Sequence, residues 1–126
     1  MSRAVDGEMP ERYQPDPWVD AEAYTDSKGT LRCFIPLVAL QWIDATPGDV
    51  LHAAPKSDSE VMIGASVPQI LGGMDVHAKY KGDDIPCRRL SARLKSYLDL
   101  SEGDTVRYHK ADGDRIRAEL LEVDDE

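Results

Sequence analysis

The sequence is poor in the residues from which metal and redox sites are built. Its two cysteines, Cys33 and Cys87, lie far apart, which excludes zinc binding by a Cys-x-x-Cys pattern. Its three histidines are dispersed, and none stands at a metal-binding spacing from an acid or a cysteine. We therefore expect no metal and no cofactor. We expect two reduced, buried thiols in a cytoplasmic protein, and a disulfide between them stays open as the alternative.

The motifs of the common enzyme classes are also missing. The chain has no Gly-x-Ser-x-Gly, no phosphate-binding loop and no His-Glu-x-x-His, so we do not expect an enzyme. It has no uninterrupted apolar run of about 18 residues and no basic-then-apolar segment at its beginning. These absences predict a cytoplasmic protein without a membrane partner.

Asparagine is absent and lysine is scarce, whereas acidic residues number 24 and give a formal net charge of −9. This composition resembles that of proteins from salt-loving archaea. Because the acidic charge then belongs to the whole proteome, it does not exclude binding to nucleic acid. With 126 residues the chain has room for one domain with one modest core.

The charge is distributed unevenly along the chain. Residues 1–76 carry a net charge of −7, residues 77–117 carry +3, and residues 118–126 carry −5. The basic side chains of the middle segment are Lys79, Lys81, Arg88, Arg89, Arg93, Lys95, Arg107, Lys110, Arg115 and Arg117. Positive charge is therefore concentrated in the second half of the chain.

One short pattern occurs twice, 55 positions apart. Each copy has an apolar segment with an aromatic residue, then a hydroxyl residue, then Gly-Asp and a strand-like run. The identical positions are Asp44 and Asp99, Gly48 and Gly103, and Asp49 and Asp104. An internal repeat indicates that two half-folds build one domain together.

Each copy predicts a helix of about two turns, which packing must stabilise. In the second copy Ser91 is a good N-cap, and Leu90, Leu94 and Leu98 share one helical face. These leucines are expected to face the core.

The helix of the first copy is expected to start after Pro36, because proline is tolerated in the first turn. We expect Val38 and Trp42 to face inward. Trp42 and Tyr97 occupy equivalent positions in the two copies, and their periodicity favours core packing over stacking on a base.

The Gly-Asp step follows each helix and opens a hairpin. Glycine permits the left-handed backbone of a tight turn, and the carboxylates of Asp49 and Asp104 can accept amide hydrogen bonds within it. We therefore interpret both aspartates as structural. The step Asp112-Gly113 predicts the hairpin turn of the second copy.

The repeated unit is strand, strand, short helix, Gly-Asp turn, strand, strand. The resulting division of the chain is a flexible N-terminal arm at 1–18, repeat 1 at 19–63, a linker at 64–73, repeat 2 at 74–122 and an acidic tail at 123–126.

Two segments of repeat 1 carry a family resemblance: Lys28-Gly29-Thr30-Leu31-Arg32-Cys33-Phe34-Ile35-Pro36 and, after the short helix, Thr46-Pro47-Gly48-Asp49-Val50. They resemble the AbrB/SpoVT-type domain, whose signature is a glycine, a strand ending in Ile-Pro, a short helix and a Gly-Asp turn leading into a hairpin. Repeat 2 keeps the helix and the turn but has Leu90-Ser91 in place of Ile-Pro.

The resemblance implies a fold that is mostly β with two short helices. Family members usually pair two chains into an interleaved swapped-hairpin barrel, so two copies in one chain imply a single-chain pseudo-dimer of that barrel. The Gly-Asp turn also occurs in double-psi-like cradle-loop barrels, which are the structural alternative.

The resemblance also implies a transcription regulator that binds double-stranded DNA. In this family the leading hairpin and the first helical turn typically meet DNA. In repeat 2 these elements carry Lys79, Lys81, Arg88, Arg89 and Arg93. Arginine can bind phosphates or guanine edges through two hydrogen bonds, and lysine supplies a point charge. The competing interpretation is that these are solvated strand residues that balance nearby aspartates.

The corresponding stretch of repeat 1 offers Glu22, Asp26, Lys28 and Arg32. The symmetric pair of basic faces that a palindromic site requires is therefore missing from the sequence. Either a homodimer presents two copies of repeat 2, or DNA binding has been lost. The alternative function is a protein-interaction module, antitoxin-like or partner-binding, without DNA binding.

Overall fold

The computed structural model describes residues 17–121, so most of the predicted arm and the tail at 123–126 lie outside the described residues. The fold is mostly β with two short helices, as predicted. The first seven strands are β1 (Trp18–Glu22), β2 (Tyr24–Thr25), β3 (Leu31–Arg32), β4 (Phe34–Ile35), β5 (Val50–Ser57), β6 (Glu60–Gly64) and β7 (Gly73–Asp75). The other elements are α1 (Leu37–Trp42), β8 (His77–Ala78), β9 (Pro86–Arg89), α2 (Ala92–Leu98), β10 (Thr105–Lys110) and β11 (Arg115–Leu120).

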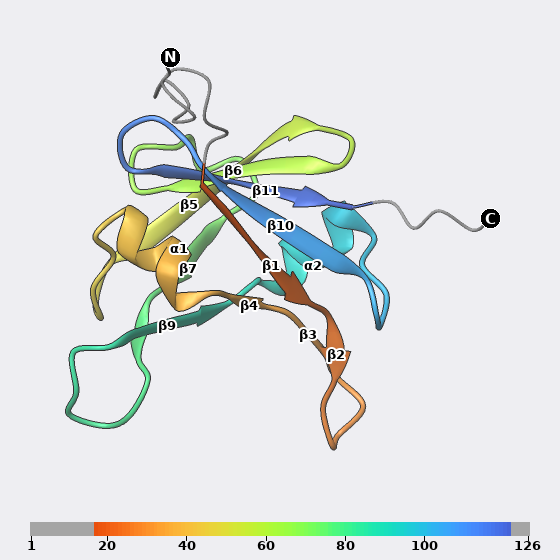
Figure 1. Ribbon diagram of the computed structural model, residues 1–126, viewed down its shortest axis with the longest axis horizontal. Helices are drawn as coiled ribbons and strands as arrows, with labels where there is room; N and C mark the ends of the chain where they lie inside the picture. Colours follow the sequence, from red (N-terminus) through yellow and green to blue (C-terminus); the bar gives the residue numbers. More distant parts are fainter. Residues whose placement is uncertain (1–16, 122–126) are drawn as a thin grey trace, which may run out of the picture.

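The strands form one large sheet and two small ones. The large sheet has the order β1-β10-β11-β6-β5-β7, and the small sheets are β2-β3 and β4-β9-β8. The large sheet lies on one side of the molecule, with the small sheets opposite and the helices at the two ends (Figure 1). Between residues 17 and 121 the strands do not close into a single barrel, because the large sheet ends at β1 and β7.

The two repeats form hairpins with the same register. In repeat 1 Ala53 faces Ile63, and in repeat 2 the equivalent residues Tyr108 and Ala118 face each other. The core lies beneath these hairpins and contains all four residues. Burial alternates along β10 and most of β11, so that one face of this hairpin is turned to the core.

The leading strand of each repeat pairs with the hairpin of the other repeat. β1 of repeat 1 pairs with β10 of repeat 2, and β7 of repeat 2 pairs with β5 of repeat 1. The Gly-Asp turns make the same exchange. The amide of Gly48 donates to the carbonyl of Val76 at 2.9 Å, and that of Gly103 donates to Ala23 at 2.9 Å. Each repeat therefore completes the other.

A pseudo-twofold axis follows from these registers. Under the exchange of repeats, the pair Phe34–Arg89 in β4 and β9 maps onto itself, and so does the pair Met62–Arg117 in β6 and β11. The axis therefore passes through both pairs, at the centre of the large sheet and between β4 and β9 of the small sheet opposite.

Two loops project on the same side of the molecule, on either side of this axis (Figure 1). Loop 26–30 joins β2 to β3, and loop 79–85 joins β8 to β9. The amides of Asp26 and Lys79 close them by donating to the carbonyls of Thr30 and Ile85. The second loop is longer than the first by two residues.

The predicted roles of the turn aspartates are confirmed. Oδ2 of Asp49 accepts from the amide of Thr46 at 2.8 Å, and Oδ2 of Asp104 accepts from the amide of Ser101 at 2.8 Å. In both turns the carboxylate therefore bonds back to the amide three residues before it, and this hydrogen bond stabilises the turn.

The N-cap prediction for α2 is also confirmed, because the hydroxyl of Ser91 accepts from the amide of Leu94. Leu94 and Leu98 are buried in the core. In α1 the inward position predicted for Val38 is wrong: its side chain is 40% exposed, while the next two residues, Ala39 and Leu40, are buried. In so short a helix, contacts with neighbouring elements rather than apolar periodicity decide which face is buried.

The aromatic residues predicted to face the core are only partly buried. Trp42 and Tyr97 both pack against its edge, and the hydroxyl of Tyr97 donates to the carbonyl of Ser57 at 2.8 Å. The expectation of two buried thiols is correct for Cys33 and wrong for Cys87, which is half-buried, and both cysteines are free. Within residues 17–121 no helix is long and apolar enough to cross a membrane.

Candidate nucleic-acid interface

Five basic side chains from both repeats line one concavity of about 570 Å³, here called the basic hollow: Arg32, Lys79, Arg88, Arg89 and Lys95. Its other lining residues come from loop 26–30, β8, β9 and the start of α2, and they include no aspartate or glutamate. In a chain with a net charge of −9, a concavity lined by cations without carboxylates is a local reversal of charge.

Arg88 and Arg89 lie next to each other in β9 and have different surroundings. Nε of Arg88 donates to the carbonyl of Arg89 at 2.8 Å, and a guanidinium nitrogen of Arg88 lies 3.3 Å from the carbonyl oxygen of Asp75. Burial lowers the pKa of Arg88 from its usual value. Arg89 is exposed, with its guanidinium carbon 5.5 Å from the centre of the Phe34 ring. Arg89 is therefore the better placed of the two to meet an anion.

Arg32 brings a cation from repeat 1, but this cation is already paired. Its Nε donates to Asp26 at 2.8 Å. The amide of Thr30 and the guanidinium of Arg32 hold the pKa of Asp26 at about 2. Because the carboxylate of Asp26 offsets the charge of Arg32, this pair lowers the net positive charge that repeat 1 adds to the hollow.

Lys95 ties the two repeats together. Its Nζ donates to the carbonyl of Leu31 in β3 at 2.5 Å. It stands one helical turn after Ser91, on the side of α2 that faces the hollow. Arg32 and Lys95 were not among the site residues predicted from the sequence. The helical spacing from Ser91 is the signal that could have identified Lys95.

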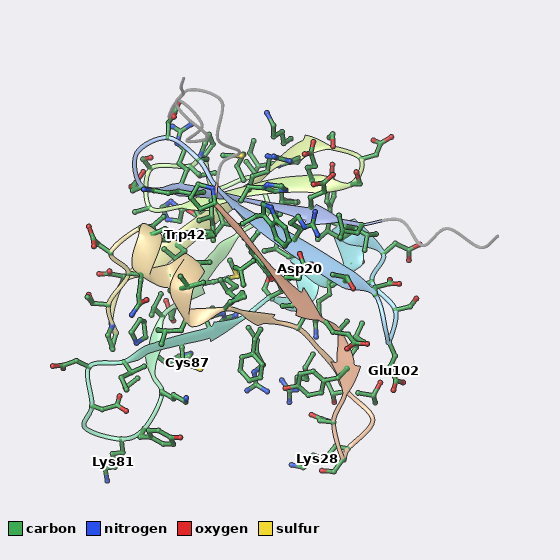
Figure 2. All side chains as sticks on the ribbon, in the orientation of Figure 1. Asp20, Lys28, Trp42, Lys81, Cys87 and Glu102 are labelled. Carbon is green, nitrogen blue, oxygen red and sulfur yellow. The ribbon has the colours of Figure 1, made fainter. Side chains whose placement is uncertain are left out.

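The five residues predicted from the sequence are only partly gathered. Lys79, Arg88 and Arg89 line the hollow. Lys81 is exposed on loop 79–85, and Figure 2 places it at the tip, with Lys28 at the tip of the opposite loop. Arg93 is exposed on α2 outside the hollow, and its Cδ lies beside Gly72 of the linker.

Residues 17–121 contain no group of three or more histidine, cysteine or acidic side chains placed to hold a metal ion. Comparisons with models of protein families, with curated proteins and with solved structures give no match.

Proposed function

We propose that this protein binds double-stranded DNA through the basic hollow, as a cytoplasmic transcription regulator of the AbrB/SpoVT type. The observation that carries the proposal is the gathering of five cationic side chains from both repeats in a concavity whose lining has no carboxylate. Contacts to phosphates dominate affinity for DNA and require such a local positive potential.

The position of the hollow beside the pseudo-twofold axis supports the same function. Arg89 lies on the axis, and the tips of the two loops carry Lys28 and Lys81 on either side of it (Figure 2). Duplex DNA has local twofold symmetry, so a face with one cation at its centre and one at each flank matches its two strands. One chain thus supplies a cation at both flanks, whereas the basic hollow itself has an apolar counterpart across the axis.

We infer in addition that the chain is a single-chain counterpart of the swapped-hairpin pair. The inference is supported by the pairing of β1 with β10 and of β7 with β5, in which each leading strand joins the hairpin of the other repeat. The sequence resemblance in the first repeat points the same way.

The test is duplex binding measured by fluorescence anisotropy from low to molar KCl. Affinity is expected to fall linearly on a log–log plot against salt. The double variant Lys79→Ala/Arg89→Ala is expected to bind about tenfold or more weakly, because two charge-assisted contacts are lost. Its salt slope is expected to be shallower by about two, one for each lost phosphate contact.

The matched control is Lys56→Ala/Lys110→Ala, which removes the same charge from exposed positions in β5 and β10 outside the hollow. It is expected to leave affinity nearly unchanged. Arg93→Ala, also outside the hollow, is expected to resemble this control. An equal loss in all three variants would refute the basic hollow as the binding site. No duplex binding at any salt would refute the function and favour the protein-interaction alternative.

A further inference from the structure

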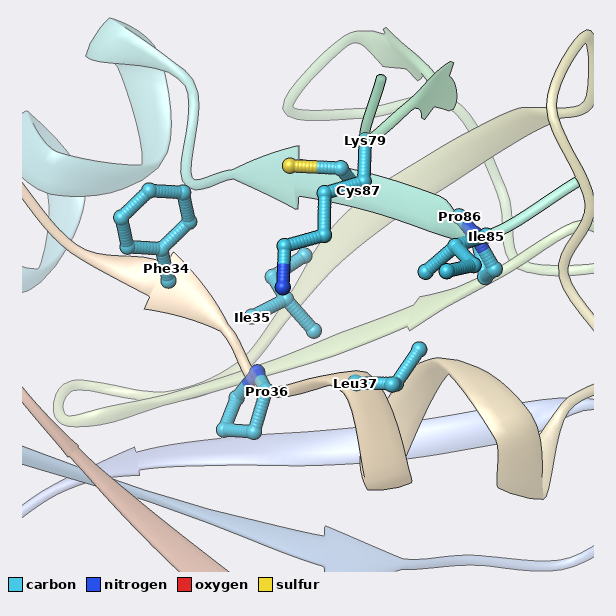
Figure 3. Close-up of a pocket in the computed structure, with 8 residues that line it drawn as sticks. All are labelled: Phe34, Ile35, Pro36, Leu37, Lys79, Ile85, Pro86 and Cys87. Atoms are coloured by element: carbon cyan, nitrogen blue, oxygen red, sulfur yellow. The ribbon is translucent and has the colours of Figure 1, made fainter. Parts of the chain in front are cut away.

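A second concavity, here called the apolar pocket, lies between β4, the start of α1 and the end of loop 79–85. Its volume is about 260 Å³. The apolar side chains around it are Phe34, Ile35, Pro36, Leu37, Ile85 and Pro86. Three of them, Phe34, Leu37 and Ile85, are about 40% exposed. Figure 3 shows the six apolar side chains arranged around the side chain of Lys79. Exposed apolar side chains gathered around a cavity are typical of a binding site.

The apolar pocket is the counterpart of part of the basic hollow under the pseudo-twofold axis. Phe34 and Leu37 of the pocket correspond to Arg89 and Ala92 of the hollow, 55 positions further along. Cys87 lines both concavities. The same backbone geometry therefore occurs twice, once with apolar and once with cationic side chains. The two sites have different chemistry, so they are suited to different ligands.

The one charged residue that lines the apolar pocket is Lys79. Figure 3 shows its side chain reaching across the pocket, with Nζ among the apolar side chains. Within residues 17–121 no carboxylate forms an ion pair with it. Its counterpart at the closure of the other loop is Asp26, which is paired with Arg32. The apolar pocket thus has an apolar wall and one cation without an acidic partner.

We propose that the apolar pocket binds a small organic acid with an apolar tail. The tail lies against Phe34, Leu37 and Ile85, and the carboxylate binds the ammonium group of Lys79. The volume is near the lower end for ligand sites, which favours a short chain or one ring over a larger molecule. Lys79 also lines the basic hollow, so an occupied pocket would withdraw one cation from the DNA surface, a consequence that rests on the proposed function.

The test uses octanoate and 1-octanol as probes, in calorimetric titrations of the full chain without DNA. The acid and the alcohol share the apolar tail and differ in charge. Octanoate is expected to bind saturably and about tenfold or more tightly than octanol, because a charge-assisted contact is gained. Lys79→Gln is expected to remove this difference. Leu37→Ser is expected to weaken both ligands, because a solvent-exposed part of the wall is lost without a change in the core.

The matched control is Lys81→Gln, which removes the same charge from the same loop but outside the pocket. It is expected to bind octanoate like the wild type. Circular dichroism checks that each variant is folded. Absence of saturable octanoate binding, or equal binding by wild type and Lys79→Gln, would overturn the proposal. Self-association of the chain that Leu37→Ser abolishes, without octanoate binding, would replace the ligand by a second copy. None of these readouts requires DNA binding.

Discussion

Tyr108→Ala is expected to lower the free energy of unfolding by about 3–5 kcal/mol, the range for removing a large aromatic side chain from a core. Tyr108 is the largest of the fully buried side chains. Its hydroxyl donates to the carbonyl of Phe34 at 3.1 Å, which joins β10 to β4 across the core. The alanine variant leaves a cavity and an unpaired carbonyl group. Urea denaturation followed by circular dichroism measures the loss.

The conservative variant Tyr108→Phe separates packing from the hydrogen bond. It keeps the ring and is expected to cost about 1–3 kcal/mol, because the carbonyl of Phe34 loses its donor. Equal stability of Tyr108→Phe and wild type would contradict the role given to the hydroxyl. Equal losses in the two variants would contradict the role given to packing.

The pH dependence of stability gives the tyrosine a second signature. Burial, followed by the neighbouring thiol of Cys33, raises the pKa of Tyr108 well above its ordinary value of 10.0. The unfolded chain releases the phenolic proton at about pH 10 and the folded chain retains it. The folded state therefore keeps its full stability below pH 10, and its free energy of unfolding falls as the pH rises further. This alkaline loss is expected to be smaller in Tyr108→Phe than in wild type.

Gly64→Ala is expected to cost about 3 kcal/mol, at the upper end of what overpacking costs. Gly64 ends β6 opposite Arg115. A methyl group there would overlap the carbonyl oxygen of Asp114 and would lie 3.2 Å from Cα of Arg115. Both neighbours are backbone atoms in the β10–β11 hairpin, so neither can move without disturbing the pairing of the two repeats.

The matched control is Gly73→Ala, in the first residue of β7. A methyl group there would meet only side chains, of which Cγ1 of Val50 is nearest at 3.3 Å. Small side-chain shifts can relieve that contact, so the expected loss is below about 1 kcal/mol. Chemical denaturation of both variants measures the difference. If the two cost the same, close approach of the backbone at Gly64 does not limit stability.

The local features of the fold were predictable because their causes lie within a few residues of each other. The cap at Ser91 and the turn carboxylates of Asp49 and Asp104 are examples. The occurrence of aspartate at both position 44 and position 99 also has a local cause. Asp44 and Asp99 both adopt a left-handed backbone, with φ of 55° and 56°. Aspartate tolerates this conformation better than most residues.

The exchange of strands between repeats was not visible in the sequence itself. β1 and β10 lie at opposite ends of the described chain, and no pattern within either strand specifies its partner. The predicted orientation of α1 was wrong for the same reason, because contacts between residues distant in sequence decide that Val38 faces solvent.

The candidate site was predictable only where its residues lie close together in the sequence. Arg88 and Arg89 were selected as part of the leading hairpin of repeat 2, and β9 carries both of them to the hollow. Arg32 was not selected, because it belongs to repeat 1, whereas most residues that line the hollow belong to repeat 2. Arg93 was selected from its place in the first helical turn, and the structure places it outside the hollow.

The axis position has one further consequence. In an assembly of two identical chains, a residue on a twofold axis must face its own copy, so arginine would meet arginine and repel it. Here Arg89 faces Phe34 instead and packs over its ring. Arg117 faces Met62 at the other end of the axis. Covalent joining of the repeats thus frees the residues at the centre of symmetry from being identical, and a substitution there changes one side of the molecule alone.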